Sequence, residues 1–123
     1  MIPLLTKPYE ASTAIAPFRI VAFSDAASGA KVAQATLATQ PLVGTTGKVP
    51  TAAGEMADIT RVGIGGVQLG GTVIAGDRLT SDANGCAIKA TIAGQHIIGT
   101  AEAPGVAGDI IDYLRAGGVH SGN

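Results

Sequence analysis

Few side chains in this sequence have the type and spacing that catalysis or metal binding requires. The two histidines, His96 and His120, are far apart and lack the H-x-x-x-H spacing that brings two imidazoles to one metal ion. Cys86 is the only cysteine, so one chain can form neither an internal disulfide nor a thiolate cluster. We expect structural or solvated histidines and a small, buried, unreactive Cys86. The sequence therefore predicts no metal site and no cofactor.

Three short segments resemble known ligand-binding loops, and each departs from the pattern. Residues 82–85, Asp-Ala-Asn-Gly, look like part of a calcium loop, but a hairpin turn explains them without the missing bidentate Glu. Residues 44–48, Gly-Thr-Thr-Gly-Lys, resemble a phosphate loop, yet Leu42 and Val49 replace the required Gly and Ser or Thr. Residues 63–66, Gly-Ile-Gly-Gly, lack the third glycine of the dinucleotide fingerprint.

No arrangement for nucleophilic or acid–base catalysis stands out either. A serine–histidine–aspartate set would need His96 to meet a serine and an acid that nothing in the sequence places beside it. Asp109 and Asp112 fall on opposite faces of a predicted strand, and Asp109 is better placed to accept hydrogen bonds in a turn. We therefore predict that the protein is not an enzyme.

The charge pattern argues against nucleic acid and membrane partners. Eight basic and nine acidic residues give a net charge of −1, and the basic residues are scattered, with few aromatic side chains beside them. The uncharged stretches are too short and too rich in glycine for a membrane-spanning helix, and the N-terminal residues lack the pattern of a secretory signal. We expect a protein that is made soluble and stays where it is synthesised.

A repeated turn sequence marks the start of several predicted strands, which are the elements that would position any site. Ala-Gly followed by Glu, Asp or Gln occurs at residues 53–55, 75–77, 93–95 and 107–109. Glycine supplies the positive φ of a tight turn, and the following acidic or amide side chain can hydrogen-bond local backbone. A short apolar segment follows each copy, which predicts strands over residues 56–62, 78–80, 96–101 and 110–115.

The remaining segments also predict strands, which indicates an all-β fold. Residues 18–23 form a strand pattern, residues 31–37 continue as a second strand in competition with a short helix over 26–39, and residues 41–43 form a short strand or bridge. Glycines inside the long strand over 55–69 indicate a bend, and residues 76–89 read as a hairpin with Asn-Gly at its tip. We predict an all-β fold, a small β-barrel or β-sandwich.

The chain divides by composition into three parts. Residues 1–17 hold three prolines and predict an extended N-terminal arm, with a frayed terminus as the alternative, followed by a β-rich domain over 18–117 and a flexible tail over 118–123. The apolar side chains of the arm, Ile2, Leu4, Leu5 and Tyr9, should pack on a neighbour or back on the domain. Because the core is built from small residues, we expect further burial against sister subunits or a larger partner.

The glycine-bent strand, residues 71–85 and residues 98–115 together resemble the capsid cement, or head decoration, proteins of tailed bacteriophages. The resemblance implies a structural virion protein that is made in the host cytoplasm and binds the outer surface of the capsid. There it would bridge neighbouring major capsid protein subunits and stabilise the shell. It implies a homo-oligomer, with a trimer favoured and a dimer possible.

Within this resemblance, Ile2, Leu4, Leu5 and Tyr9 are the candidate partner contacts, and the arm could add a strand to a sheet edge of a capsid subunit. The alternative is a β-barrel surface module that binds a carbohydrate or another ligand. Sugar sites usually present aromatic platforms, and we expect the few aromatic residues here to be structural. A small enzyme subunit is the third possibility.

Overall fold

The computed structural model describes residues 2–25, 27 and 29–119, and this part of the chain forms strands and no helix. All strands belong to one sheet with the order β1-β3-β2-β4-β5-β9-β8-β6-β7. The strands are β1 (Ile2–Ala11), β2 (Ile20–Phe23), β3 (Lys31–Gln34), β4 (Leu42–Thr45), β5 (Met56–Gln68), β6 (Arg78–Ser81), β7 (Ala87–Lys89), β8 (His96–Ala101) and β9 (Ile110–Val119). The predicted all-β fold is confirmed.

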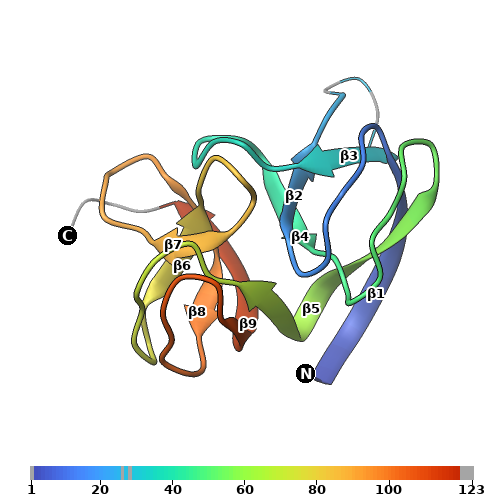
Figure 1. Cartoon of the computed structure of the whole chain (residues 1–123). Coiled ribbons are helices and arrows are strands. Elements are labelled where there is room, and N and C mark those ends of the chain that lie inside the picture. The colour runs from blue at the N-terminus through green and yellow to red at the C-terminus, as the bar shows by residue number, and fades with distance from the viewer. Residues whose placement is uncertain (1, 26, 28, 120–123) are drawn as a thin grey trace.

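The first five strands close into a small barrel, here called the barrel lobe. Closure comes from the extra pairing of β1 with β5, which joins the two ends of the series β1-β3-β2-β4-β5. The β1–β3 pair is parallel and the other pairs of the barrel are antiparallel. Its core consists of Tyr9, Ala11, Ile15, Val21, Val32, Val43, Ala57 and Ile59, with Phe23 packed against them. Figure 1 shows this lobe on the right.

The second half of β5 leaves the barrel and begins the second lobe, seen on the left of Figure 1. From Gly63 to Gln68, β5 pairs with β9, and β8, β6 and β7 follow in the sheet. Gly63 has a φ of +99°, which only glycine adopts without strain, and a register shift between β1 and β5 lies directly before it. The bend expected from the glycines is therefore present, and it turns one sheet into two lobes.

The four predicted turns share one geometry. Gly54, Gly76, Gly94 and Gly108 all have positive φ, between +86° and +94°. The glycine is the third of the four residues of each turn, and a positive φ at that position is typical of a type II turn. At Asp77, for example, the backbone N–H donates to the Ile74 carbonyl at 3.2 Å, and the carboxylate accepts from the Ile74 N–H at 3.0 Å. The acidic or amide residue thus closes each turn twice, as the sequence predicted.

In the second lobe, the turns at Gly76 and Gly108 are each hydrogen-bonded to the segment that leads into the other turn. The segments around residues 69–77 and 101–109 run antiparallel and are joined by a bridge between Val73 and Gly105. In each turn the glycine N–H donates a hydrogen bond, and the backbone carbonyl of the aspartate that follows it accepts one. The four bonds are Gly76 N–H to Ala101 O, Ala101 N–H to Asp77 O, Gly108 N–H to Leu69 O (each 2.8 Å) and Leu69 N–H to Asp109 O (2.7 Å).

The barrel lobe repeats this arrangement. Ala11 donates to the Glu55 carbonyl at 2.9 Å and accepts from the Gly54 N–H at 2.8 Å, and Ile15 is bridged to Thr51. Phe18 takes the place of the second glycine and has a φ of +53°, a rare value for a residue with a side chain. Both lobes therefore contain two turns that each bond the strand leading into the other, an arrangement we call a pair of crossed turns. The second turn of the barrel lobe lacks the Ala-Gly-acid sequence, so the sequence did not predict the similarity.

Of the two alternatives for the predicted N-terminal arm, packing back on the domain is the one that the structure shows for residues 2–11. Residues 2–11 form β1, which pairs with β5 along its length and with β3 at Glu10 and Ala11. The side chain of Tyr9 is 2 % exposed and lies in the barrel core. The arm therefore packs back on the domain, and β1 belongs to the same barrel as β2 to β5. The tail expected over 118–123 lies outside the described residues from 120 onward.

The hairpin over residues 76–89 is present as β6 and β7, and Asp82 accounts for its tip. The Asp82 carboxylate accepts from the N–H groups of Asn84 at 2.8 Å and Cys86 at 2.9 Å, and Gly85 has a φ of +73°. The carbonyl of Gly85 also accepts from the Ile20 N–H at 2.7 Å. The residues that resembled a calcium loop thus form a turn that docks the second lobe on β2.

Replacement of Gly99 by alanine should destabilise the fold strongly. A Cβ at Gly99 would overlap the backbone carbonyl of Leu114 and lie 2.8 Å from the Tyr113 ring, and backbone cannot rotate away as a side chain can. We expect Gly99→Ala to lower the free energy of unfolding by about 3 kcal/mol. Gly47→Ala, whose Cβ meets no atom within 4 Å, should change it by less than about 0.5 kcal/mol. Urea denaturation of both variants measures this, and equal losses would contradict the packing argument.

Candidate functional site

The described residues contain no cluster suited to metal binding. No group of three His, Cys, Asp or Glu side chains lies close enough to hold an ion in this part of the chain. His96 is half-buried in β8, and its backbone N–H donates to the Ala38 carbonyl at 2.8 Å. His120 lies outside the described residues. Cys86 is buried, and burial raises the pKa of its thiol, which disfavours the reactive thiolate.

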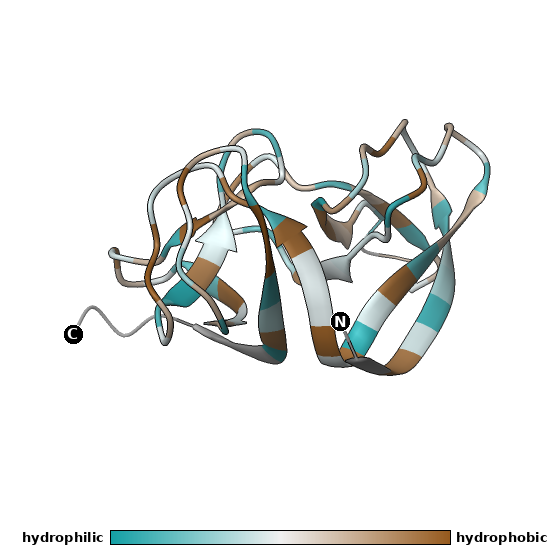
Figure 2. Cartoon of the chain, turned by 60° about the horizontal axis from the view of Figure 1, so that its bottom comes forward, coloured by the Kyte–Doolittle hydropathy of each residue, from teal (hydrophilic) through white to brown (hydrophobic). Residues whose placement is uncertain are grey.

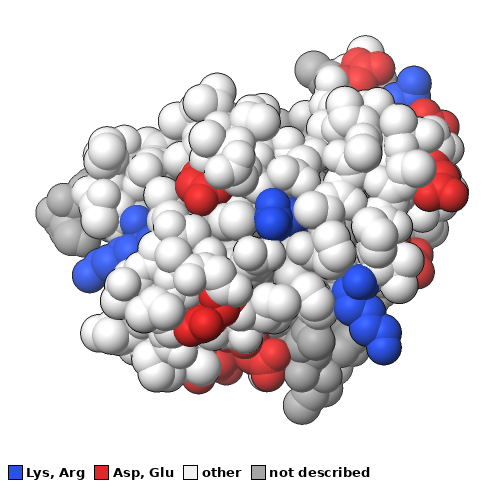
Figure 3. Space-filling model, viewed as in Figure 1, with Lys and Arg blue, Asp and Glu red and all other residues white. Residues whose placement is uncertain are grey.

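Within the described residues, no helix has the length and apolar character needed to cross a membrane. On the face shown in Figure 3, most of the surface is uncharged, acidic side chains gather at the lower edge of the view, and the basic side chains lie apart from one another.

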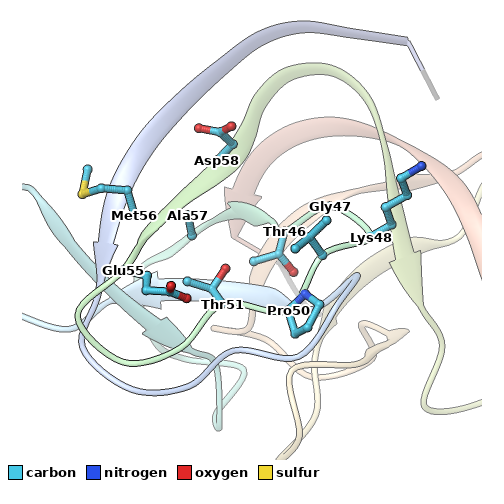
Figure 4. Close-up of a pocket in the computed structure, with 10 residues that line it drawn as sticks. Thr46, Gly47, Lys48, Pro50, Thr51, Glu55, Met56, Ala57 and Asp58 are labelled. Carbon is cyan, nitrogen blue, oxygen red and sulfur yellow. The ribbon is translucent and has the colours of Figure 1, made fainter.

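A hollow lies on the barrel lobe, between the loop after β4 and the start of β5 (Figure 4). It has a volume of about 590 Å³ and is lined by residues 46–51 and 55–58. Much of its polar lining is already used within the fold, because the Thr46 hydroxyl donates to the Ala16 carbonyl at 3.0 Å and Glu55 accepts from the Ala52 N–H at 2.8 Å. None of the ten lining residues is aromatic, so the hollow offers no stacking platform for a sugar ring.

Both tyrosine side chains are buried in the core. Tyr9 packs edge to face on Phe23 with ring centroids 6.0 Å apart. Tyr113 is fully buried, and its hydroxyl shares a 2.8 Å hydrogen bond with Thr45 across the two lobes. Burial raises the pKa of Tyr113 to about 12. Tyr9 is therefore not available as a partner contact, and neither tyrosine can stack on a surface ligand.

Arginine side chains close the junction between the lobes. Arg115 on β9 donates from Nε and Nη2 to the Val43 carbonyl on β4, at 3.1 and 3.0 Å, and from Nη1 to the Ile98 carbonyl at 3.3 Å. Arg61 donates to the same Val43 carbonyl. Burial lowers the pKa of Arg115, and the nearby charge of Arg61 adds to this effect. These contacts fix the position of the second lobe on the barrel.

An apolar face crosses the sheet where β5 bends. Leu5 on β1 is the register partner of Val62 on β5, and Ile64 is the partner of Leu114 on β9. Cross-strand partners project from the same side of a sheet, so Leu5 lies beside Val62 and Ile64 lies beside Leu114. The two pairs are neighbours along β5, on either side of Gly63, and Leu4 adjoins them at a register shift of β1. We call these five residues the β5-bend face.

The β5-bend face is open to solvent. Leu4 is 76 % exposed, Leu5 is 52 % exposed, and Val62 and Leu114 are 45 % and 44 % exposed. Figure 2 shows apolar bands at the bend of β5, close to the N-terminal end of the chain. Grouped exposed apolar residues of this kind mark interaction surfaces. The sequence had singled out Leu4 and Leu5; the side chain of Ile2 lies outside the described residues.

The free edge of β1 is less suited to binding than its face. Beyond Glu10 and Ala11, this edge has no partner strand among the described residues. Pro3 and Pro8 lack an N–H, and register shifts at Leu5 disturb the ladder. Proline and irregular pairing are devices that keep edge strands from adding further strands. Partner contacts therefore fit the side chains of the β5-bend face better than strand addition.

No family model matches the chain, and no curated protein matches it. Among solved structures, the chain is similar to the N base of the head fiber protein gp8.5 in bacteriophage phi29, with a TM-score of 0.70 and 16 % sequence identity. The two chains share one fold. The similarity covers 91 % of this chain and 93 % of that chain, so it includes both lobes.

The buried Tyr113 should make stability sensitive to alkaline pH. Its phenol ionises near pH 10 when unfolded and at about pH 12 when folded, so this contribution is complete below pH 10 and is lost as the pH rises through 12. We expect a loss of up to about 3 kcal/mol over that interval. Tyr113→Phe should lose about 1 kcal/mol at pH 9, from the missing hydrogen bond, and show a weaker pH dependence above pH 10.

Thr45→Val is the matched control, because it removes the same hydrogen bond and keeps the buried phenol. Chemical denaturation at pH 9, 10 and 11 measures all three proteins. If Tyr113→Phe and the original chain lose stability in parallel above pH 10, Tyr113 is not the group responsible.

Proposed function

We propose that this protein is a structural component of a phage virion that binds the outer surface of the head. The observation that carries the proposal is the fold similarity to the N base of a phage head fiber protein over nearly the whole of both chains. The resemblance of residues 71–85 and 98–115 to head decoration proteins is an independent argument for the same class.

In this proposal the major capsid protein is the partner, and the protein stabilises the shell by bridging neighbouring subunits. The β5-bend face is the contact, since Leu4, Leu5, Val62 and Leu114 present grouped apolar side chains on rigid strands. Buried apolar contacts at the centre of an interface supply most of its affinity.

A homo-oligomer suits this role, with a trimer favoured and a dimer possible. A symmetric oligomer on a symmetric shell engages several equivalent sites at once, so each contact can be weak while the whole is bound firmly. The core clusters hold many Ala and Val residues, which leaves stability to be gained by contact with other subunits. Catalysis, nucleic acid and lipid have no part in the proposal.

The first test is the copy number of this chain in purified virions. Quantitative mass spectrometry of gradient-purified particles should give a fixed, near-stoichiometric ratio of this chain to the shell protein. Absence of the chain from the particles would refute the proposal and direct attention to soluble ligands.

Polar substitution on the β5-bend face should weaken attachment. We expect the double variant Leu5→Ser, Val62→Thr to bind purified heads at least about tenfold more weakly in a co-sedimentation assay, because two apolar contacts are lost. Both side chains are exposed, so the thermal stability of the isolated chain should change little. Ile92→Thr, a substitution of another exposed apolar residue that is not part of this face, is the control and should bind normally. Normal binding by the double variant would exclude this face.

A further inference from the structure

The second lobe carries an apolar surface separate from the β5-bend face. It lies on the two loops that join β5 to β6 and β8 to β9, which Figure 1 shows side by side at the lower left. The antiparallel bridge between Val73 and Gly105 fixes how these loops align. We call the segments 72–74 and 104–106 the turn ribbon.

The register decides which side chains of the turn ribbon face outward. Val73 is buried, so its neighbours Thr72 and Ile74 point to the opposite side, and the partners of these neighbours across the bridge are Val106 and Pro104. All four are exposed, Ile74 at 62 % and Val106 at 55 %. Ile74, Pro104 and Val106 therefore form one apolar surface on the outside of the lobe.

The barrel lobe provides an internal comparison for these residues. In its equivalent pair of crossed turns, Ala52 stands where the second lobe has Ile74, two residues before the glycine, and Ala16 stands where it has Val106. The turn at Gly54 has the same geometry as the turn at Gly76, with Ala52 in place of Ile74. The larger exposed side chains of the turn ribbon are therefore not required for folding.

Carboxylates border the turn ribbon. A hollow of about 510 Å³ begins at Pro104 and is lined by residues 102–104 and 109–112. Its lining includes Glu102, Asp109 and Asp112, and it includes no basic side chain. The exposed side chain of Ile110 lies at the same hollow. An apolar surface beside an acidic hollow is complementary to a protein segment that carries apolar side chains next to a Lys or Arg.

We infer that the turn ribbon is a second docking surface, and that its occupant is a segment of the shell protein with apolar residues beside a basic one. This inference rests on the proposed function and specifies how bridging is achieved. The β5-bend face and the turn ribbon share no residue, and Ile110 and Asp112 of the hollow lie on the same side of β9 as Leu114, so in this proposal the two surfaces contact adjacent parts of the shell.

The test compares matched turns in the full chain. Ile74→Thr with Val106→Thr alters the turn ribbon, and Ile92→Thr alters the same position of the turn before β8, which is not part of the ribbon. We expect the ribbon variant to bind purified heads about tenfold more weakly than the original chain, and Ile92→Thr to bind normally. If the ribbon variant does not fold, Ile74→Ala replaces it, since the matched turn at Gly54 forms with alanine at that position.

A charge variant tests the stated chemistry of the occupant. Glu102→Gln should weaken binding by a few-fold at low salt and by less at high salt, because exposed charge pairs are screened. Unchanged binding and salt dependence would overturn the acidic part of the inference.

The outcomes separate the two proposals. Failure of the original chain to sediment with heads overturns the proposed function and this inference together. Binding by the original chain, with equal binding by the ribbon variant, overturns the turn ribbon alone and leaves the proposed function standing.

Discussion

Strand β5 must supply main-chain hydrogen bonds to two lobes, and every other part of the structure depends on its change of direction at Gly63. Before this residue, β5 closes the barrel by pairing with β1; after it, β5 pairs with β9 and starts the second lobe. The φ of +99° is strained for any residue with a side chain. The same bend brings β1, β5 and β9 together on the outside and thereby creates the β5-bend face.

The second organising element is the pair of crossed turns, which occurs once in each lobe. The turns at Gly54, Gly76 and Gly108 are each closed by their own acidic side chain, and each turn of a pair bonds the strand that enters its partner turn. A turn that is encoded by a few neighbouring residues thus forms hydrogen bonds with a segment that is distant in the sequence. The crossed turns of the two lobes also differ in what they display, with alanine on the barrel lobe and isoleucine and valine on the second lobe.

Local features of the structure could be predicted from the sequence because local chemistry determines them. The Ala-Gly turns, the hairpin at Asp82 and the bend of β5 follow from glycine, acids and β-branched residues in short windows. The fate of residues 2–11 could not be predicted in this way. Pro3 and Pro8 argued against a central strand, and within the described residues one edge of β1 is largely unpaired and can accommodate proline.

The candidate site was predicted only in part for the same reason. Leu4 and Leu5 stood out as apolar residues in a segment without an evident core role, whereas Tyr9 in the same segment is buried. Val62 and Leu114 join the face only through the register of β5 with its neighbours, and no residue pattern within either strand specifies that register.

The pairing of β1 with β5 also constrains how the chain acquires its structure. Strand β1 precedes its partner at residues 56–64 in the sequence, so the barrel cannot close until β5 has also left the ribosome. Contacts between residues so distant in sequence form slowly, because the intervening chain must first be ordered. Until that point Tyr9 and the strand edges remain uncovered, and a nascent chain in this state is at its most prone to aggregation.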